Sequence, residues 1–254
     1  MRIALTGSKG FIGSHVMNRL MALGHEIDEW DEKINKPLRD FTCVSKGQSP
    51  QIDYVIHLAA YADVRESINE PQKYWNNNVT YTTEIQKFCD FYQIPLLYAS
   101  SSCIHDWQLS PYGMSKKVNE ETAFPNQVGL RFTTVYGDGA RDEMLIGRLI
   151  EGRVSYLTDH IRDFVHVDDV VDIIIELMGH DLRLNYIKPA YDIGTGNGVV
   201  VSGLGALAGY PDIPTRKGDE CEAHDNTADM RSIQALTGWV PKYDILEYIK
   251  DKTK

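Results

Sequence analysis

The sequence predicts an α/β fold in which a doubly wound parallel sheet is joined to a small C-terminal domain. In the first third of the chain, short apolar runs alternate with amphipathic stretches, as βαβ units do. A glycine-rich turn separates the first apolar run from the first helical stretch, and after Gly194 the pattern loosens into glycines, prolines and short apolar runs. Strands that alternate with helices imply a parallel sheet with helices on both faces.

The elements are expected in a regular order along the chain. Strands are predicted at residues 2–6, 25–31, 53–58, 96–100 and 128–132. Helices are predicted at about residues 12–23, 78–92, 112–122 and 168–178. Gly24 ends the first of these helices, and the acidic pair Asp168-Asp169 opens the last one.

Length, composition and net charge argue against several classes of protein. The 254 residues are 43% hydrophobic, with no apolar run as long as the roughly 18 residues of a membrane span and no signal-peptide pattern. The cysteines show no metal spacing or disulfide framework, so we expect a cytoplasmic protein without a metal site. The formal net charge of −10 argues against nucleic-acid binding, although a few local arginines would suffice for a small anionic substrate.

The glycine-rich turn has the features of a pyrophosphate-binding loop. It reads Gly7-Ser8-Lys9-Gly10-Phe11-Ile12-Gly13, follows a predicted strand and opens a predicted helix. The first glycine permits the tight turn, the second lets the backbone approach phosphate, and the third lets the helix pack on the strand. The helix N-terminus then presents free N–H groups and a positive dipole end to the pyrophosphate of a dinucleotide, as in a Rossmann fold.

An acidic residue at the end of the second strand selects the dinucleotide. Asp31 lies about 20 residues beyond the glycines, where a carboxylate accepts hydrogen bonds from the ribose hydroxyls. A carboxylate there repels a 2′-phosphate, so NAD is favoured over NADP. Asp28 and Glu29 are nearby alternatives, but Asp31 stands best at the strand end.

Tyr112 and Lys116 are four residues apart, so a helix places them on one face. A lysine ammonium near a tyrosine phenol lowers its pKa and lets the phenolate act as a base. The pair follows the Ser100-Ser101-Ser102 strand end in a chain that already carries the cofactor loop, and this position gives the spacing its weight.

Together these motifs resemble those of the extended short-chain dehydrogenases/reductases of the NAD-dependent nucleotide-sugar epimerase/dehydratase type. The resemblance runs from residue 1 to about residue 241. Its motifs are Thr6-Gly7-x-x-Gly10-Phe11-Ile12-Gly13, Asp40-Phe41, His57-Leu58-Ala59-Ala60, Asn78-Val79, Ser100-Ser101, Tyr112-x-x-x-Lys116, Arg162-Asp163-Phe164-Val165-His166-Val167-Asp168-Asp169, Arg216-x-Gly218-Asp219 and Gly238-Trp239-x-Pro241.

The resemblance implies a role for each matching residue. Asp40 and Phe41 would hold the adenine of NAD, and Ala59 and Ala60 would line the cofactor near its ribose and phosphates. Asn78, Phe11 and Ile12 would complete the cofactor site with Gly7, Gly10, Gly13 and Asp31. Ser101 would hydrogen-bond the reacting oxygen, Tyr112 would be the base, and Lys116 would also bind the nicotinamide ribose.

The substrate side and the assembly are also implied by the resemblance. Arg162 and Arg216 would bind the diphosphate of a nucleotide sugar, for which planar guanidinium forks are well suited. Ser101, Ser102 and Thr134 would contact the sugar. Residues 1–133 with 163–194 would form the NAD-binding domain, and residues 134–162 with 195–254 the substrate domain. The helices beginning near Asn78 and Tyr112 would pair into a homodimer interface.

The chain departs from the family pattern around the substrate. The segments from Asp106 to Tyr112 and from Tyr136 to Arg162 are short, and Thr134 stands where related epimerases usually have an asparagine. Ser102 and Cys103 replace the Asp-Glu pair of the 4,6-dehydratases, which argues against dehydration.

The expected activity is NAD-dependent epimerisation of a nucleotide sugar through a transient 4-keto intermediate. One alternative is a 3,5-epimerase or 4-keto reductase, in which Cys103 moves a proton if its pKa is lowered. A second alternative is a non-catalytic NAD-binding sensor or scaffold, which the shortened loops would permit.

Overall fold

A parallel sheet of six strands forms the centre of this computed structural model, which describes residues 1–45 and 50–253. The strand order is β2-β1-β3-β4-β5-β9, and every neighbouring pair is parallel. The strands are β1 (Arg2–Thr6), β2 (Glu26–Trp30), β3 (Tyr54–His57), β4 (Leu96–Ser101), β5 (Gln127–Phe132) and β9 (Ala190–Ile193). The predicted doubly wound parallel sheet is therefore confirmed. The order reverses at β1, between β2 and β3, and such a switch point leaves a crevice at the carboxyl ends of the strands.

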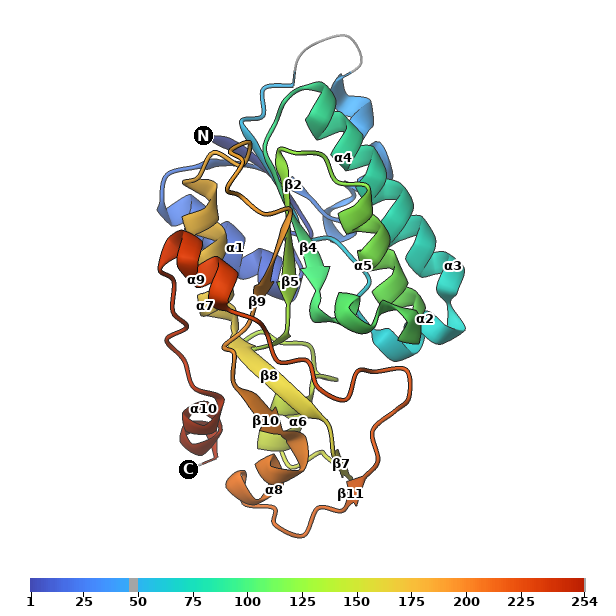
Figure 1. The fold of residues 1–254 in the computed structure, drawn as a ribbon, viewed down its shortest axis with the longest axis vertical. Helices are drawn as coiled ribbons and strands as arrows, with labels where there is room; N and C mark the ends of the chain where they lie inside the picture. Colours follow the sequence, from blue (N-terminus) through green and yellow to red (C-terminus); the bar gives the residue numbers. More distant parts are fainter. Residues whose placement is uncertain (46–49, 254) are drawn as a thin grey trace.

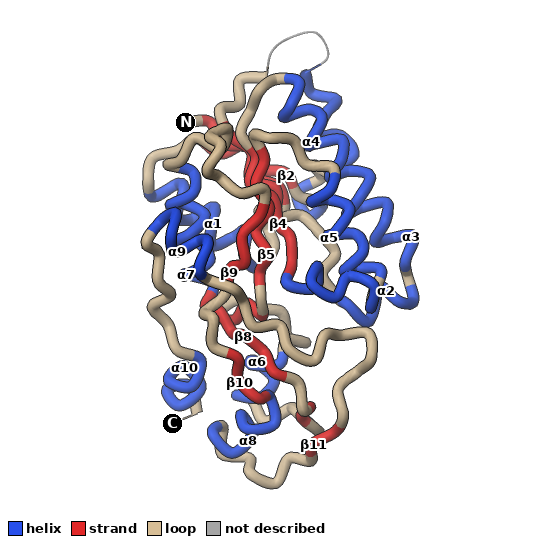
Figure 2. Tube along the Cα trace, in the orientation of Figure 1, coloured by secondary structure: helices blue, strands red, loops and turns tan. Residues whose placement is uncertain are grey.

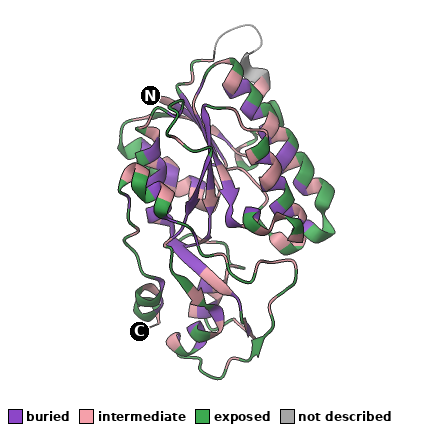
Figure 3. Ribbon diagram, viewed as in Figure 1, coloured by how far each residue is buried: buried purple, intermediate pink, exposed green. Residues whose placement is uncertain are grey.

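Helices cover both faces of this sheet, as Figure 1 shows. One face carries α1 (Phe11–Ala22), α7 (Val167–Met178) and α9 (Arg231–Thr237). The other carries a π-helix (Trp75–Tyr81), α4 (Thr82–Phe91) and α5 (Pro111–Glu121). Each face has its own apolar cluster, and Figure 3 shows the buried residues concentrated along the strands and the inner sides of the helices.

Two smaller sheets lie beyond the carboxyl ends of the large one (Figure 2). The first has the order β10-β8-β6, and the second pairs β11 with β7. These strands are β6 (Thr134–Tyr136), β7 (Leu157–Thr158), β8 (Ile161–His166), β10 (Gly198–Val200) and β11 (Thr215–Arg216). The helices around them are α6 (Leu145–Ile150), α8 (Leu204–Leu207) and α10 (Ile245–Lys252), which share a third apolar cluster with the strands. The domain boundaries stay a prediction, and β8 spans the expected boundary at residue 163.

Several connections carry short helices of their own. They are α2 (Val64–Asn69), α3 (Pro71–Tyr74) and the 3₁₀ helices Glu32–Ile34, Leu38–Ser45, Ser102–Leu109 and Val201–Gly203. The helix predicted at 78–92 begins earlier than its apolar pattern indicated, because a π-helical segment precedes α4.

The structure also bears on the expectations for the cysteines and for membrane-spanning segments. Cys89, Cys103 and Cys221 are free thiols, whereas the side chain of Cys43 lies outside the described residues. Over the same described ranges, no helix combines the length and the apolar character that crossing a bilayer requires.

Candidate active site

A cavity of about 410 Å³ opens at the carboxyl ends of the parallel strands. Its walls come from the glycine loop after β1, the segment after β3, the end of β4 and the start of α5. The opposite wall comes from β6, β8 and residues 222–226. The predicted site residues that line it are Gly7, Gly10, Phe11, Ile12, Gly13, Ala60, Ser101, Ser102, Tyr112, Lys116, Thr134 and Arg162. The fold thus brings the predicted cofactor loop, the catalytic set and part of the predicted substrate set into one space.

The glycine loop fits a pyrophosphate for steric reasons. Gly7 has a positive φ of 72°, and a Cβ on Gly13 would lie 1.9 Å from the carbonyl oxygen of Gly7, so α1 can approach the loop only without a side chain there. Gly10, the N-cap of α1, offers no capping side chain. The first N–H groups of the helix therefore stay available for an anion.

Asp31 is connected to the glycine loop by hydrogen bonds. Its carboxylate accepts from the backbone N–H of Lys9 at 3.0 Å and from that of Lys33 at 2.9 Å. It is partly exposed and does not line the cavity itself. A carboxylate held beside the loop in this way fits the ribose of NAD, which remains a prediction for this residue.

Phe41 and Asp40 lie away from the cavity. The Phe41 ring is buried, with its centroid 5.1 Å from that of Trp30 and 5.4 Å from that of Phe88. Asp40 is exposed, 3.7 Å from Arg39. The Phe41 side chain is thus part of a hydrophobic core cluster, and an adenine contact for this pair stays a prediction.

Asn78 is completely buried and braces the segment after β3. Its Oδ1 accepts from the N–H of Tyr61 at 3.0 Å, and its Nδ2 donates to the Tyr61 carbonyl at 2.9 Å. Ala60 lines the cavity, whereas Ala59 uses its N–H to donate to Thr6 Oγ1 at 3.2 Å. Asn78 therefore supports the cofactor wall in this structure and does not line the cavity.

Ser101, Tyr112 and Lys116 come together in a largely buried group. The side chain of Ser101 lowers the pKa of Tyr112 and so favours the phenolate. The Nζ of Lys116 lies 5.8 Å from the centroid of the Tyr112 ring and donates to the carbonyl of Ala99 at 2.8 Å. Because Ser101 ends β4 and the other two residues share one face of α5, the parallel sheet and the helical spacing together build the group.

The electrostatics of this group differ from the sequence prediction. Burial raises the pKa of Tyr112 and the neighbouring Cys103 raises it further, while the Ser101 hydrogen bond and Arg141 lower it. Lys116 is not among the groups that lower it. The Lys116 ammonium donates to the backbone carbonyl of Ala99. Burial lowers the pKa of Lys116 to about 8.

Cys103 lies in the wall of the cavity next to the catalytic group. Burial raises the pKa of its thiol, and a hydrogen bond with Ser101 and the charge of Arg162 oppose this only in part. A thiol with a raised pKa is a weak proton acceptor at neutral pH.

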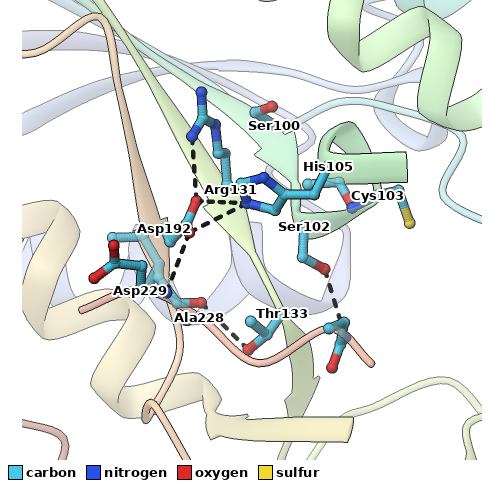
Figure 4. A network of polar contacts seen from close by, with 12 residues as sticks. Ser100, Ser102, Cys103, His105, Arg131, Thr133, Asp192, Ala228 and Asp229 are labelled. Atoms are coloured by element: carbon cyan, nitrogen blue, oxygen red, sulfur yellow. Dashed lines mark hydrogen bonds and ion pairs between the residues drawn. The ribbon is translucent and has the colours of Figure 1, made fainter. Parts of the chain in front are cut away.

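A partly exposed polar network holds the segment that follows Ser101 (Figure 4). His105 contacts Asp192 on β9 at 3.1 Å, and Arg131 on β5 contacts the same carboxylate at 3.3 Å. Arg131 also makes a two-pronged contact with Glu120 of α5, with distances of 2.9 and 2.7 Å. Ser100 donates to Glu120 at 2.6 Å. The network therefore connects the end of β4 to the helix that carries Tyr112.

Ser102 and Thr134 line the cavity from two different strand ends, and Asn226 lies between them. The Nδ2 of Asn226 is 3.5 Å from Ser102 Oγ and 3.3 Å from Thr134 Oγ1. These contacts bring a residue of the C-terminal segment into a group that otherwise comes from β4 and β6.

The two predicted arginines have different surroundings. Arg162 is largely buried, lines the cavity and donates to Glu222 at 2.9 Å. It also lines a second cavity of about 370 Å³ that shares several wall residues with the first. Arg216 is exposed and lines neither cavity, but its guanidinium lies 4.3 Å from the ring centroid of Tyr156, which lines the second.

Sequence reasoning missed Arg65, Arg141, Glu222 and Asn226. Glu222 also accepts from Arg65 at 3.0 Å, so it bridges two arginines where the cavities meet. Arg141 lines the catalytic cavity, and its guanidinium makes no hydrogen bond or ion pair to any residue that the structure describes. These residues belong to no recognisable spacing, and only the fold brings them to the cavity.

Comparisons with known proteins agree on one family for this chain. The pattern that defines the NAD dependent epimerase/dehydratase family matches residues 3–194. Protein CapI of Staphylococcus aureus is 29% identical over 231 residues, which cover 70% of this chain and 69% of that protein. A UDP-glucose 4-epimerase of Pisum sativum is 25% identical over an aligned length of 338 residues, with 99% of this chain and 94% of that enzyme covered. Because this aligned length exceeds 254 residues, the pea enzyme has segments that this chain lacks.

Solved structures agree with this assignment. MoeE5 in complex with UDP-glucuronic acid and NAD is 26% identical, with a TM-score of 0.83 over 98% of this chain and 96% of that one. The UDP-glucose 4-epimerase of Thermotoga maritima, solved with UDP-glucose, has a TM-score of 0.80 at 22% identity, over 100% of this chain and 97% of that one. The second comparison supports the fold alone.

Proposed function

Because the chain belongs to the NAD-dependent epimerase/dehydratase family and uses NAD, we propose that it epimerises a nucleotide sugar at C4 through a transient 4-keto intermediate. The observation that carries the proposal is the placement of Ser101, Tyr112 and Lys116 in the same cavity as the glycine loop. A tyrosine base buried beside a dinucleotide loop suits the removal of a hydroxyl proton, coupled to the transfer of hydride to NAD and back.

Each residue of the proposed catalytic group has its own role. Tyr112 takes the proton from the C4 hydroxyl and returns it when the epimer forms. The hydroxyl of Ser101, which lines the same cavity as Tyr112, stabilises the same oxygen as it becomes a ketone. The Nζ of Lys116 keeps a buried positive charge near the tyrosine and binds the nicotinamide ribose. The glycine loop holds the pyrophosphate with backbone N–H groups.

We propose a UDP-sugar as the substrate, with Arg162 on its diphosphate and Arg216 nearby. The pea relative is named a UDP-glucose 4-epimerase, and MoeE5 binds UDP-glucuronic acid. Arg141 adds support for a sugar that carries a carboxylate, because this exposed, cavity-lining guanidinium makes no ion pair within 4 Å in the described part of the chain, and Glu66 acts on it only through its charge at longer range. Guanidinium groups can bind a carboxylate with two parallel hydrogen bonds.

The alternatives have weaker support. Proton transfer by Cys103, as in a 3,5-epimerase or 4-keto reductase, would need a lowered thiol pKa. Burial raises the pKa of Cys103 as it raises that of Tyr112, so the placement of Ser101, Tyr112 and Lys116 beside the glycine loop is what favours the 4-epimerase. A sensor or scaffold that only binds NAD has no need for Ser101, Tyr112 and Lys116 together in the cavity wall. Deuterium uptake at C3 or C5 from heavy water, lost in Cys103→Ser, would favour the first of these alternatives.

We also propose a homodimer formed through α4 and α5. Trp75, Phe91 and Met114, which lie in or next to these helices, are exposed large apolar residues. Such residues are typical of an interface when they gather on one side. Light scattering that gives the monomer mass at micromolar concentrations would exclude this assembly.

The test of the activity follows a panel of UDP-, GDP- and dTDP-sugars by NMR with the NAD-loaded protein. The proposal expects conversion of one UDP-sugar to its C4 epimer by the wild type. In Tyr112→Phe, which keeps the buried ring and removes only the hydroxyl, the rate should fall by roughly 10² to 10⁴. Conversion of no sugar by the wild type, or full activity of Tyr112→Phe, would contradict the proposal.

A further inference from the structure

We infer that Asn226 is a positioning residue that turns the hydroxyl protons of Ser102 and Thr134 into the catalytic cavity, so that this wall binds a hydrogen-bond acceptor on the sugar. The inference rests on the proposed function, which supplies a sugar in this cavity. It assigns a specificity role to a residue of the C-terminal segment, outside the region 3–194 that matches the family pattern.

The orientation of the Asn226 carboxamide is determined by a neighbour that can only donate. The backbone N–H of Asp163 lies 2.8 Å from Oδ1, so this atom must be the oxygen. The nitrogen, Nδ2, then faces Ser102 Oγ and Thr134 Oγ1 at 3.5 and 3.3 Å. An amide nitrogen donates and does not accept, so both hydroxyl oxygens act as acceptors toward it.

This arrangement decides where the two hydroxyl protons point. Each hydroxyl has one proton, and neither can be given to Nδ2. In the described residues, Ser102 Oγ and Thr134 Oγ1 have no other hydrogen-bond partner. Both residues line the cavity. The O–H groups of Ser102 and Thr134 are therefore free to donate hydrogen bonds to a ligand in the cavity. This wall of the cavity presents hydrogen-bond donors.

The charge of the cavity favours an acceptor that is also anionic. Arg141 lines the same cavity with no ion pair among the described residues, whereas the other guanidinium, Arg162, is paired with Glu222. Two hydroxyl donors and an unpaired guanidinium match the lone pairs of a carboxylate. The preferred sugar is thus a uronic acid, and a sugar without an acceptor at that position binds less well.

Backbone hydrogen bonds along β8 hold the segment that carries Asn226 in place. Its segment lies along β8, where the N–H of Ile161 donates to the His224 carbonyl at 2.8 Å and the N–H of Asn226 approaches the Ile161 carbonyl at 3.4 Å. Ala228 follows and donates its N–H to Asp163 Oδ2 at 3.1 Å. The carboxamide is therefore held by the backbone on both sides, as a positioning group must be.

The experiment compares Asn226→Asp with the wild type in the NAD-loaded protein. Aspartate keeps an oxygen for the Asp163 N–H but replaces the donor Nδ2 with an acceptor, so both hydroxyl protons turn toward residue 226. Binding of UDP-glucuronic acid, UDP-glucose, UDP-xylose and UDP is measured by calorimetry. We expect the affinity for UDP-glucuronic acid relative to UDP-xylose to fall about tenfold or more, with the affinity for UDP changed less than threefold. Asn185→Asp, an exposed change of the same charge, should behave as the wild type.

A second variant separates positioning from folding. Asn226→Ala removes the donor without adding charge, and it should raise KM for the uronic acid more than it lowers kcat. Equal preference for UDP-glucuronic acid and UDP-xylose in wild type and Asn226→Asp would overturn the inference. Because the readout is binding, this failure is distinct from failure of the proposed function, which appears as wild-type protein that binds UDP-sugars and epimerises none.

Discussion

The Nζ of Lys116 donates a 2.8 Å hydrogen bond to the carbonyl oxygen of Ala99, so the lysine head group is held against β4 in the protein interior. Burial lowers its pKa from 10.5 to about 8. Between pH 8 and pH 10.5, Lys116 is therefore mostly protonated in the unfolded chain and mostly neutral in the folded one, so the unfolded chain binds more protons. The stability of the NAD-free protein should therefore rise as the pH increases through this window.

This gives a prediction for Lys116→Met. From pH 8 to pH 10.5, the free energy of unfolding of the wild type should increase relative to Lys116→Met by up to about 3 kcal/mol. Urea unfolding at several pH values measures the difference. Lys117→Met, which removes a surface lysine paired with Glu121 on the same helix, should keep the wild-type pH dependence. Parallel pH curves for wild type and Lys116→Met would contradict the prediction.

A second prediction concerns Gly13. Alanine there would place its Cβ 1.9 Å from the Gly7 carbonyl oxygen, a backbone atom that cannot move without opening the loop. We expect Gly13→Ala to lose co-purifying NAD and about 3 kcal/mol of stability.

Gly147→Ala is the matched control for that change. Gly147 lies inside α6, and a Cβ there would meet no atom within 4 Å. This variant should keep NAD and gain about 0.5 to 1 kcal/mol from the higher helix propensity of alanine. Absorbance of bound cofactor and thermal unfolding measure both effects. NAD retained by Gly13→Ala would show that the close approach is not required.

A third prediction concerns His105. Its hydrogen bond and charge interaction with Asp192 raise its pKa despite partial burial. The stabilisation is therefore fully present below the unfolded value of about 6.5 and is lost as the pH rises through the folded value. His105→Gln should destabilise the protein by about 0.5 kcal/mol more at pH 5.5 than at pH 9. Denaturant midpoints at the two pH values test this, and a larger loss at pH 9 would refute it.

A fourth prediction concerns Glu222, which accepts from Arg162 at 2.9 Å and from Arg65 at 3.0 Å. An anionic ligand must compete with this carboxylate for the guanidinium groups. Glu222→Gln should therefore bind UDP about threefold to tenfold more tightly at low salt. Glu220→Gln, the same charge change at an exposed side chain two residues away, should have little effect. Weaker UDP binding by Glu222→Gln would mean that Glu222 positions the arginines for the ligand.

The features that depend on near neighbours in the chain could be predicted from the sequence. The glycine loop is recognisable because it lies between a predicted strand and a predicted helix, and the structure has both. The spacing of Tyr112 and Lys116 predicts that they share a helix face, because four residues make about one helical turn. The parallel sheet followed from the alternation of apolar runs, since strands joined by helices pair in one direction.

The features that depend on packing could not be predicted in this way. Phe41 is buried against Trp30, and burial raises the pKa of Tyr112, with Lys116 not among the groups that lower it. Hydrogen-bond geometry and helical period act over a few residues, whereas desolvation depends on what the whole fold excludes from water.

The amino-acid sequence is enough to predict that a dinucleotide loop, a serine and a tyrosine–lysine pair meet at the carboxyl ends of a parallel sheet, because strand ends and helix faces are set locally. Which other groups complete the cavity depends on tertiary packing. Asn226 and Glu222 reach it from the C-terminal segment, through backbone and ion-pair contacts between residues about 60 or more positions apart. Such contacts leave no spacing in the chain, because they form when the segment packs along β8.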